Sequence, residues 1–142
     1  MRRLSLALVI AAGAVVLPAT SGTATADGPL TLKRIAYRDG KQVYDERHAV
    51  IRFVLRSSAG PVGTTTVRCR NPQEPVSPCK ATSRFAEGRI IARGRVPLAS
   101  PRPVRIPIVD GTGTFRNARG DYQARINGEG KRIFTYALES FG

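Results

Sequence analysis

The feature that most constrains this chain is the stretch 110–120, which carries Gly111, Gly113 and Gly120. Glycine is typical of positions where the backbone takes a positive φ or passes close to another segment. Apolar and polar residues alternate on both sides of the stretch. We therefore expect a tight crossover between two strands of a closed sheet, in which the three glycines are structural.

The rest of the chain after residue 26 consists of short alternating runs separated by turn signals such as Asp39-Gly40 and Asn127-Gly128. Alternation with a period of two indicates half-buried strands, and short strands at regular spacing favour a sandwich or a barrel. No amphipathic helix is expected there. Eight strands are predicted, at 30–38, 49–56, 64–70, 79–85, 89–96, 104–109, 121–127 and 131–138.

Many arginines fall opposite the apolar positions of their strands, as Arg52, Arg93 and Arg105 do. A closed barrel would place the apolar set inside and these arginines outside, and closure also removes exposed sheet edges. We therefore predict an all-β, eight-stranded antiparallel barrel, although the pattern is also compatible with a sandwich. The interior of such a barrel is either filled by side chains or holds one small ligand.

The first 26 residues have the pattern of a secretory signal peptide. Met1-Arg2-Arg3 precedes an apolar run at 4–17, and the segment ends in Ala-Thr-Ala before Asp27. The run is shorter than the about 20 apolar residues of a membrane-spanning helix. No cysteine lies near the cleavage point to carry a lipid anchor. We predict a signal peptide at 1–26, a single barrel domain at 27–142, and a secreted, extracellular protein without a membrane anchor.

Cys69 and Cys79 enclose a loop that contains three prolines. In an oxidising compartment, two cysteines across a short loop are expected to form a disulfide bond. Closing such a ring contributes roughly 2–3 kcal/mol in the chain-entropy model. A C-x-x-C redox motif is absent, and two cysteines with the single histidine, His48, are too few for a structural zinc site. We predict a disulfide and no metal.

The chain is strongly basic, with 23 Lys and Arg against 10 Asp and Glu and a formal net charge of +13. A field of this size attracts polyanions such as nucleic acid, acidic glycans or teichoic-type polymers. The cations are dispersed along the chain, however, and no platform of interleaved aromatics accompanies them. This dispersion favours a solvated outer face. A cationic protein that recognises polyanions or cell-wall polymers is the alternative function.

Motifs for classical bond-breaking catalysis are absent from the sequence. No G-x-S-x-G elbow accompanies His48, and the Gly-rich stretch is not followed by a helix that could present its N-terminus to phosphate. Tyr122 and Tyr136 are candidate phenolic donors to a ligand in the lumen, or else ordinary strand aromatics with a hydroxyl at a rim. Phe53 and Phe85 are the candidate apolar contacts of such a ligand.

The segment 108–120 resembles the signature of the allene oxide cyclase and dirigent superfamily. There a Gly-Gly-Thr-Gly turn is followed by an aromatic residue and Ala-Arg-Gly; here the run reads Asp-Gly-Thr-Gly, then Phe115, then Ala-Arg-Gly. The resemblance extends over 53–138. Two departures are Asp110, in place of the first glycine, and Asp121, which separates Gly120 from Tyr122 where plant dirigents place the aromatic directly after the glycine.

The resemblance implies an eight-stranded antiparallel barrel with a central cavity, frequently trimeric in plants. Members bind hydrophobic intermediates and steer their cyclisation or radical coupling without a metal or organic cofactor. Arg116 matches the arginine that follows the aromatic in the dirigent motif and is expected to reach the lumen. We therefore predict a barrel that binds a small apolar molecule and guides its cyclisation or coupling, and a homotrimer or homodimer. If the protein is an enzyme, we expect a cofactor-free cyclase or isomerase.

Overall fold

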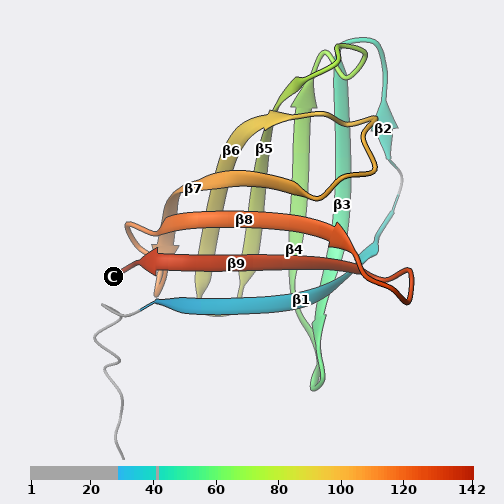
Figure 1. Ribbon diagram of the computed structural model, residues 1–142. Coiled ribbons are helices and arrows are strands. Elements are labelled where there is room, and N and C mark those ends of the chain that lie inside the picture. The colour runs from blue at the N-terminus through green and yellow to red at the C-terminus, as the bar shows by residue number, and fades with distance from the viewer. Residues whose placement is uncertain (1–28, 41) are drawn as a thin grey trace, which may run out of the picture.

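The computed structural model describes residues 29–40 and 42–142, so the predicted signal peptide at 1–26 lies outside the described residues. Strands make up most of the described chain (Figure 1). They are β1 (Leu30–Arg38), β2 (Val43–Tyr44), β3 (His48–Ser57), β4 (Gly60–Arg70), β5 (Ser77–Phe85), β6 (Gly88–Val96), β7 (Val104–Gly113), β8 (Arg119–Ile126) and β9 (Arg132–Ser140).

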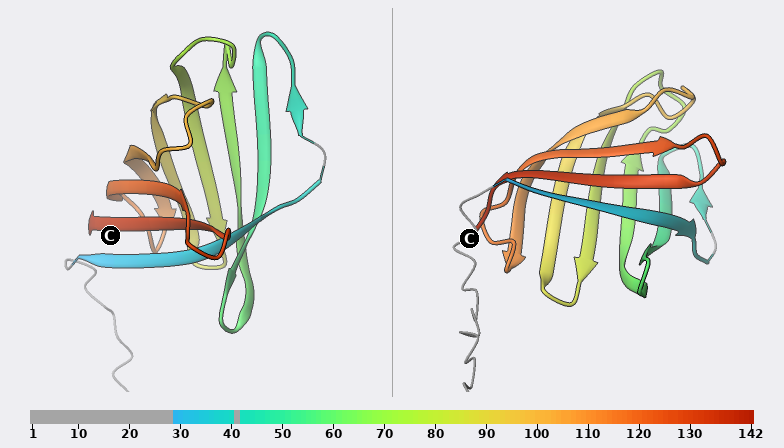
Figure 2. Two further views of the ribbon diagram at one scale, coloured as in Figure 1. Left: turned by 45° about the vertical axis from the view of Figure 1, so that its right-hand side comes forward. Right: turned by 60° about the horizontal axis from the view of Figure 1, so that its bottom comes forward.

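The strands form one antiparallel sheet in the order β1-β9-β8-β7-β6-β5-β4-β3-β2, and β1 also pairs with β3. This second pairing, in which Ala36 lies opposite Leu55, closes β1 and β3–β9 into an eight-stranded barrel. The two-residue strand β2 is an addition at the edge of β3. Figures 1 and 2 show β1, β8 and β9 running across β3–β6, so the closed sheet folds over itself around the core. The predicted barrel is confirmed.

Alternation along the strands explains which side chains enter the barrel. On β5 every second residue from Ser77 to Ser83 is buried, and on β9 Phe134, Tyr136 and Leu138 are buried. The predicted outward positions, including Arg52, Arg93 and Arg105, are exposed to solvent. The disulfide between Cys69 and Cys79 joins directly opposed residues of β4 and β5 on the inward side. That prediction is confirmed too.

The glycine-rich stretch is a hairpin between neighbouring antiparallel strands, and it is shorter than predicted because β7 continues through Gly113. Gly113 has a φ of 64°, which starts the turn into Phe115. Gly111 is buried, and a Cβ there would lie 2.0 Å from the carbonyl oxygen of Phe115. Gly120 has a φ of 145°, and a Cβ there would lie 2.0 Å from the carbonyl oxygen of Ala137 on β9. A larger side chain at any of the three glycines would therefore meet neighbouring backbone.

The two ends of the barrel differ. At the end that holds the β7–β8 turn, Phe85, Phe115 and Phe141 pack together, with ring centroids 5.7 and 6.1 Å apart. The C-terminus closes this end, because the Gly142 amide donates to the carbonyl of Arg116 at 2.6 Å. Leu55, Ile90, Ile108 and Leu138, all nearly inaccessible to solvent, fill the space behind the rings. The opposite end is open and holds the candidate site.

Candidate functional site: the open end of the barrel

The open end of the barrel encloses a cavity of about 210 Å³. Every barrel strand contributes to its wall, because each strand directs one or two side chains into the cavity. The volume exceeds the ~150 Å³ of an engineered cavity that binds benzene and is below the ~300 Å³ of drug-sized sites. The apolar wall consists of Ile51, Phe53, Val67, Cys79, Ala81, Val96, Leu98, Val104, Ile106, Ala124 and Phe134.

Three polar side chains, Arg38, Arg132 and Tyr122, interrupt this apolar wall. Arg132 is half-buried, and its guanidinium carbon lies 5.0 Å from the centroid of the Phe53 ring, a cation–π distance. Burial and the nearby charge of Arg38 lower the pKa of Arg132. Arg38 is more exposed, and its Nη1 and Nε atoms face the side-chain amide of Gln42 at 2.8 and 3.0 Å.

Tyr122 is 3% exposed and packs between two other rings of the lumen, with centroids 5.4 Å from both Phe134 and Tyr136. Its hydroxyl has no hydrogen-bond partner among the described residues. Burial raises the pKa of Tyr122 well above its ordinary value, because the phenolate would lose its hydration. The group is therefore a neutral phenol that can donate a hydrogen bond into the cavity.

A closed triangle of hydroxyl groups from Thr65, Ser83 and Tyr136 lies one inward position deeper than the cavity-lining Val67, Ala81 and Phe134, and we call it the floor of the cavity. Their oxygens are 2.8 Å (Thr65–Ser83), 2.9 Å (Thr65–Tyr136) and 2.7 Å (Ser83–Tyr136) apart. Each is at most 1% exposed. Burial raises the pKa of Tyr136 to about 12, against the smaller opposite effect of its two hydrogen bonds. The triangle therefore satisfies three buried hydroxyls and separates the cavity from the packed end.

Comparison with known proteins identifies the architecture. No protein-family model and no curated protein matches the chain. Among solved structures, a pterocarpan synthase dirigent protein matches with a TM-score of 0.58 and 19% identity, over 80% of this chain and 87% of that one. The fold is that of a dirigent-type barrel. The resemblance predicted from the sequence is confirmed at the level of the fold.

Two further solved structures share the dirigent-type barrel. A pyocyanin demethylase matches with a TM-score of 0.62 and 21% identity, over 78% of this chain and 98% of that one. The Diels-Alderase AbmU from Streptomyces koyangensis matches with a TM-score of 0.58 and 16% identity, over 85% of this chain and 72% of that one. Identities this low establish a common fold and leave the activity to be argued from the site.

The structure divides the site residues predicted from the sequence into two groups. Phe53 and Tyr122 line the cavity, whereas Tyr136 does not line it and lies one inward position deeper on β9 than the lining residue Phe134. Phe85 lies beyond the hydroxyl triangle, in the packed end of the dirigent-type barrel, and does not line the cavity. Arg116 is exposed at that same end. It does not reach the lumen, because the turn that buries Phe115 directs the next side chain outward.

Sequence reasoning missed the two arginines of the cavity, although a signal for both was present. Arg38 shares its strand face with the buried Ala36, and Arg132 shares its face with the buried Phe134. Both therefore face the same way as the apolar residues of their strands, whereas the outward arginines face the other way. An arginine on the inward face at the end of a barrel strand indicates a polar group at the mouth.

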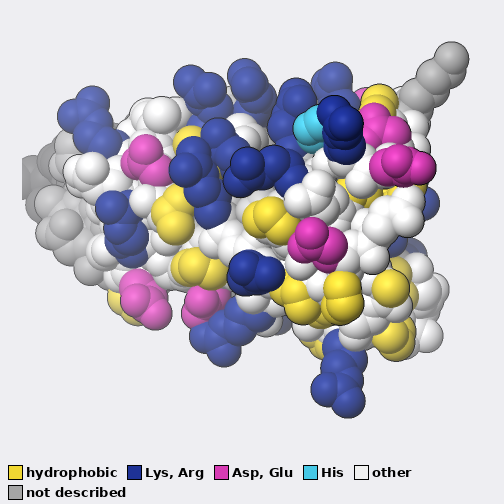
Figure 3. Space-filling model, turned by 90° about the horizontal axis from the view of Figure 1, so that it is seen from above, with side chains coloured by type: hydrophobic (Ala, Val, Ile, Leu, Met, Phe, Trp, Pro, Cys, Tyr) yellow, Lys and Arg dark blue, Asp and Glu magenta, His cyan; other side chains and the backbone are white. Residues whose placement is uncertain are grey.

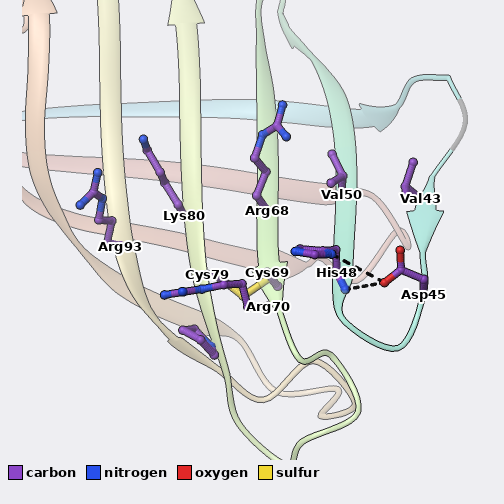
Figure 4. Close-up of a pocket in the computed structure, with 11 residues that line it drawn as sticks. Val43, Asp45, His48, Val50, Arg68, Cys69, Arg70, Cys79, Lys80 and Arg93 are labelled. Atoms are coloured by element: carbon purple, nitrogen blue, oxygen red, sulfur yellow. Dashed lines mark hydrogen bonds and ion pairs between the residues drawn. A yellow bond between two sulfur atoms is a disulfide. The ribbon is translucent and has the colours of Figure 1, made fainter.

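A larger concavity of about 560 Å³ lies on the outside of the dirigent-type barrel, over β3, β4 and β5 (Figure 4). Arg68, Lys80 and Arg93 lie directly opposite one another on neighbouring strands. Figure 3 shows Lys and Arg side chains gathered beside His48, the single histidine. Its Nδ1 lies 3.8 Å from a carboxylate oxygen of Asp45. We take the lumen as the site, because all eight barrel strands contribute to its wall, whereas six of the eleven residues that line the outer groove are exposed to solvent.

Within residues 29–40 and 42–142, no group of three His, Cys, Asp or Glu side chains is placed to hold a metal ion. The same part of the chain contains no helix that is long and apolar enough to cross a membrane. Asp110 and Asp121 do not form a carboxylate pair. Asp121 pairs with Arg105, and the side chain of Asp110 accepts a hydrogen bond from the amide of Gly111 at 2.8 Å.

Proposed function

We propose that the open end of the barrel binds a small apolar molecule and guides its cyclisation or coupling. The observation that carries this proposal is the cavity in the lumen, an apolar chamber that lies above the hydroxyl triangle at the open end of the barrel. The described residues that line the cavity include hydrogen-bond donors and cations but no carboxylate. Two proteins with the same barrel support the chemistry, since one is a Diels-Alderase and the other a pterocarpan synthase dirigent protein.

Such a chamber acts on a reaction through shape and a few fixed dipoles. Rigid walls hold the reacting ends of a substrate close together, which replaces entropy otherwise lost in reaching the transition state. The neutral phenol of Tyr122 and the cation of Arg132 can stabilise negative charge that develops on a substrate oxygen. The chain's own residues thus supply orientation, water exclusion and electrostatic stabilisation, and any activity is expected to be that of a cyclase or isomerase.

A cavity-filling substitution tests the binding site. 2-Naphthamide, a neutral probe of a size suited to the chamber, is expected to bind with a Kd of about 1 mM, from ~0.3 kcal/mol for each non-hydrogen atom. An NMR titration should shift the amides around the cavity. Ala124→Phe, which fills the mouth, should abolish these shifts.

The matched control is Gln123→Phe, which adds the same ring to the outward side of the same strand. It should leave the titration unchanged. Binding that survives Ala124→Phe, or is lost equally in both variants, would refute the lumen as the site. If the lumen site holds, native mass spectrometry of protein purified from its own culture medium should show the physiological ligand as a small adduct that is lost on unfolding.

A second candidate function rests on the outer face of β4–β6. The row Arg68–Lys80–Arg93 and the opposed pair Arg84–Arg89 place like charges on directly opposed residues, an arrangement that destabilises a sheet. None of these five forms an ion pair with a described carboxylate. A polyanion such as a cell-wall polymer would relieve the repulsion, so we propose polyanion binding at this face as the alternative.

The salt dependence of binding to an anionic polymer tests this alternative. Replacing Arg68, Lys80 and Arg93 by Gln should reduce the slope of log K against log salt by about 2–3, since each contact contributes about 0.7–0.9. The control variant Arg47→Gln, Arg116→Gln and Arg125→Gln removes the same charge from dispersed exposed positions. Equal losses in the two variants would mean that net charge alone attracts the polymer.

Export and assembly also remain proposals. We propose that the protein is secreted after cleavage before Asp27; N-terminal sequencing of protein from the culture medium should start at that residue. We further propose a homo-oligomer, a trimer or a dimer, whose contacts include the exposed apolar side chains Tyr37, Val43 and Tyr44. Sedimentation velocity should show a species larger than the monomer, and a monomer at all concentrations would refute the assembly.

A further inference from the structure

The mouth of the lumen holds two guanidinium groups side by side. Arg132 on β9 is directly opposite Ala36 on β1, and Arg38 follows Ala36 by two residues on the same face of β1. Arg38 and Arg132 are therefore diagonal neighbours at one edge of the cavity, a spacing that long side chains bridge. Both line the same chamber of about 210 Å³.

No described carboxylate compensates these two charges. The ion pairs of the described residues use other cations, and Asp39, next to Arg38, pairs with Arg52 on the outside. The group that faces Arg38 is the neutral amide of Gln42. Burial and the charge of Arg38 both lower the pKa of Arg132, which shows that its charged form is held at a free-energy cost. An anion at the mouth would remove that cost.

The guanidinium of Arg132 is already positioned to receive such an anion. Its guanidinium carbon lies 5.0 Å from the centroid of the Phe53 ring, and this cation–π contact holds the group at the edge of the apolar chamber. A planar fork of donors binds a carboxylate through two parallel hydrogen bonds. The apolar rings of Phe53, Phe134 and Tyr122 lie beneath it in the chamber.

We propose that the lumen selects apolar molecules that carry an anionic oxygen group, a carboxylate or its equivalent, bound at the mouth by Arg132 and Arg38. The apolar body of the ligand then lies inside against Phe53 and Phe134, and the phenol of Tyr122 faces it from β8. This inference rests on the proposed lumen site and adds the substrate class. It also gives the ligand a fixed orientation, acid outward and reacting body inward.

A matched pair of probes tests the inference. 2-Naphthoate and 2-naphthamide share one ring system and differ in charge, and both are titrated by NMR into the native chain. We expect 2-naphthoate to bind about tenfold more tightly, the factor typical of a hydrogen bond that gains a charge. In Arg132→Met, which keeps an apolar side chain on Phe53, most of the preference for 2-naphthoate should be lost, and the two affinities should become equal when Arg38→Gln is added. Arg38→Gln should reduce the preference in part.

Arg93→Met is the control, because it removes one unit of charge from the outer surface. It should leave the preference for 2-naphthoate unchanged. Equal binding of the two probes to the native chain would overturn the inference and leave the lumen site intact. A preference that falls equally in Arg93→Met and Arg132→Met would also overturn it, because the general field would then be the cause. Failure of both probes to bind would refute the lumen site itself, and the inference with it.

Discussion

The hydroxyl triangle beneath the cavity gives a prediction with a calculable size. Thr65, Ser83 and Tyr136 form three mutual hydrogen bonds, at 2.7 to 2.9 Å, in a fully buried setting. Each single variant, Thr65→Val, Ser83→Ala or Tyr136→Phe, removes two of the three bonds and leaves the other two hydroxyls bonded to each other. The triple variant removes all three bonds and leaves no buried hydroxyl behind.

The magnitudes follow from counting bonds. At about 1 kcal/mol for each net hydrogen bond, each single variant should lower the free energy of unfolding by about 2 kcal/mol. The three losses together amount to about 6 kcal/mol, because this count includes every bond twice. The triple variant should lose about 3 kcal/mol or less, since no polar group is left without a partner.

Urea unfolding with the disulfide intact measures these losses, with the m-value checked for constancy between variants. Thr66→Val, on the neighbouring outward position of β4, is the control and should change stability by no more than about 0.5 kcal/mol. A triple variant that loses as much as the sum of the three single variants would show that the hydroxyls act independently. The triangle would then not be the cooperative floor of the cavity.

Three other perturbations follow from the same structure. Replacing both Cys69 and Cys79 by Ala should lower the free energy of unfolding by about 3 kcal/mol, the chain-entropy value for so short a ring, and an unchanged urea midpoint would refute this. The raised pKa of Tyr122 and the pKa of about 12 of Tyr136 mean that the folded chain holds these protons more tightly than the unfolded chain. The stability they contribute is therefore fully present below about pH 10 and is lost as the pH rises toward 12. The free energy of unfolding should therefore fall between about pH 10 and pH 12, and it should fall less in Tyr136→Phe. An equal fall in both proteins would contradict the attribution to Tyr136. Gly120→Ala should cost about 3 kcal/mol or more, because its Cβ would meet the carbonyl of Ala137, whereas Gly128→Ala, with open space around it, should be nearly neutral; equal effects would refute the close-packing argument.

The closed sheet was predictable because inward and outward positions follow strict alternation over most strands. Arg52, Arg93 and Arg105 are exposed where the pattern places them, and β1 has the predicted bounds. The disulfide followed from export and loop length. The glycine-rich turn was predicted too long, because Asp110 and Gly111 still form ladder pairs with β6 before the chain turns. The short strand β2 carries no periodic pattern and was missed.

The site was predictable only in part, because alternation gives the face of a residue but not its level along the barrel axis. Phe53 and Phe85 share the inward parity, yet the hydroxyl triangle lies between their levels, so only Phe53 meets the cavity. Arg116 was expected in the lumen by resemblance, and its outward direction depends on how the turn buries Phe115. Arg38 and Arg132 have the inward parity of their strands, but neither was predicted to reach the lumen, because charged side chains are rarely buried in a core.

The measurement that most directly tests ligand binding in the lumen is the set of intermolecular NOEs between bound 2-naphthoate and the protein. We predict contacts from the naphthalene protons to the rings of Phe53, Tyr122 and Phe134, all of which line the open cavity. Contacts to Val43 and Val50, which line the outer groove, would instead place the probe on the basic surface. That result would contradict the lumen as the binding site of this barrel.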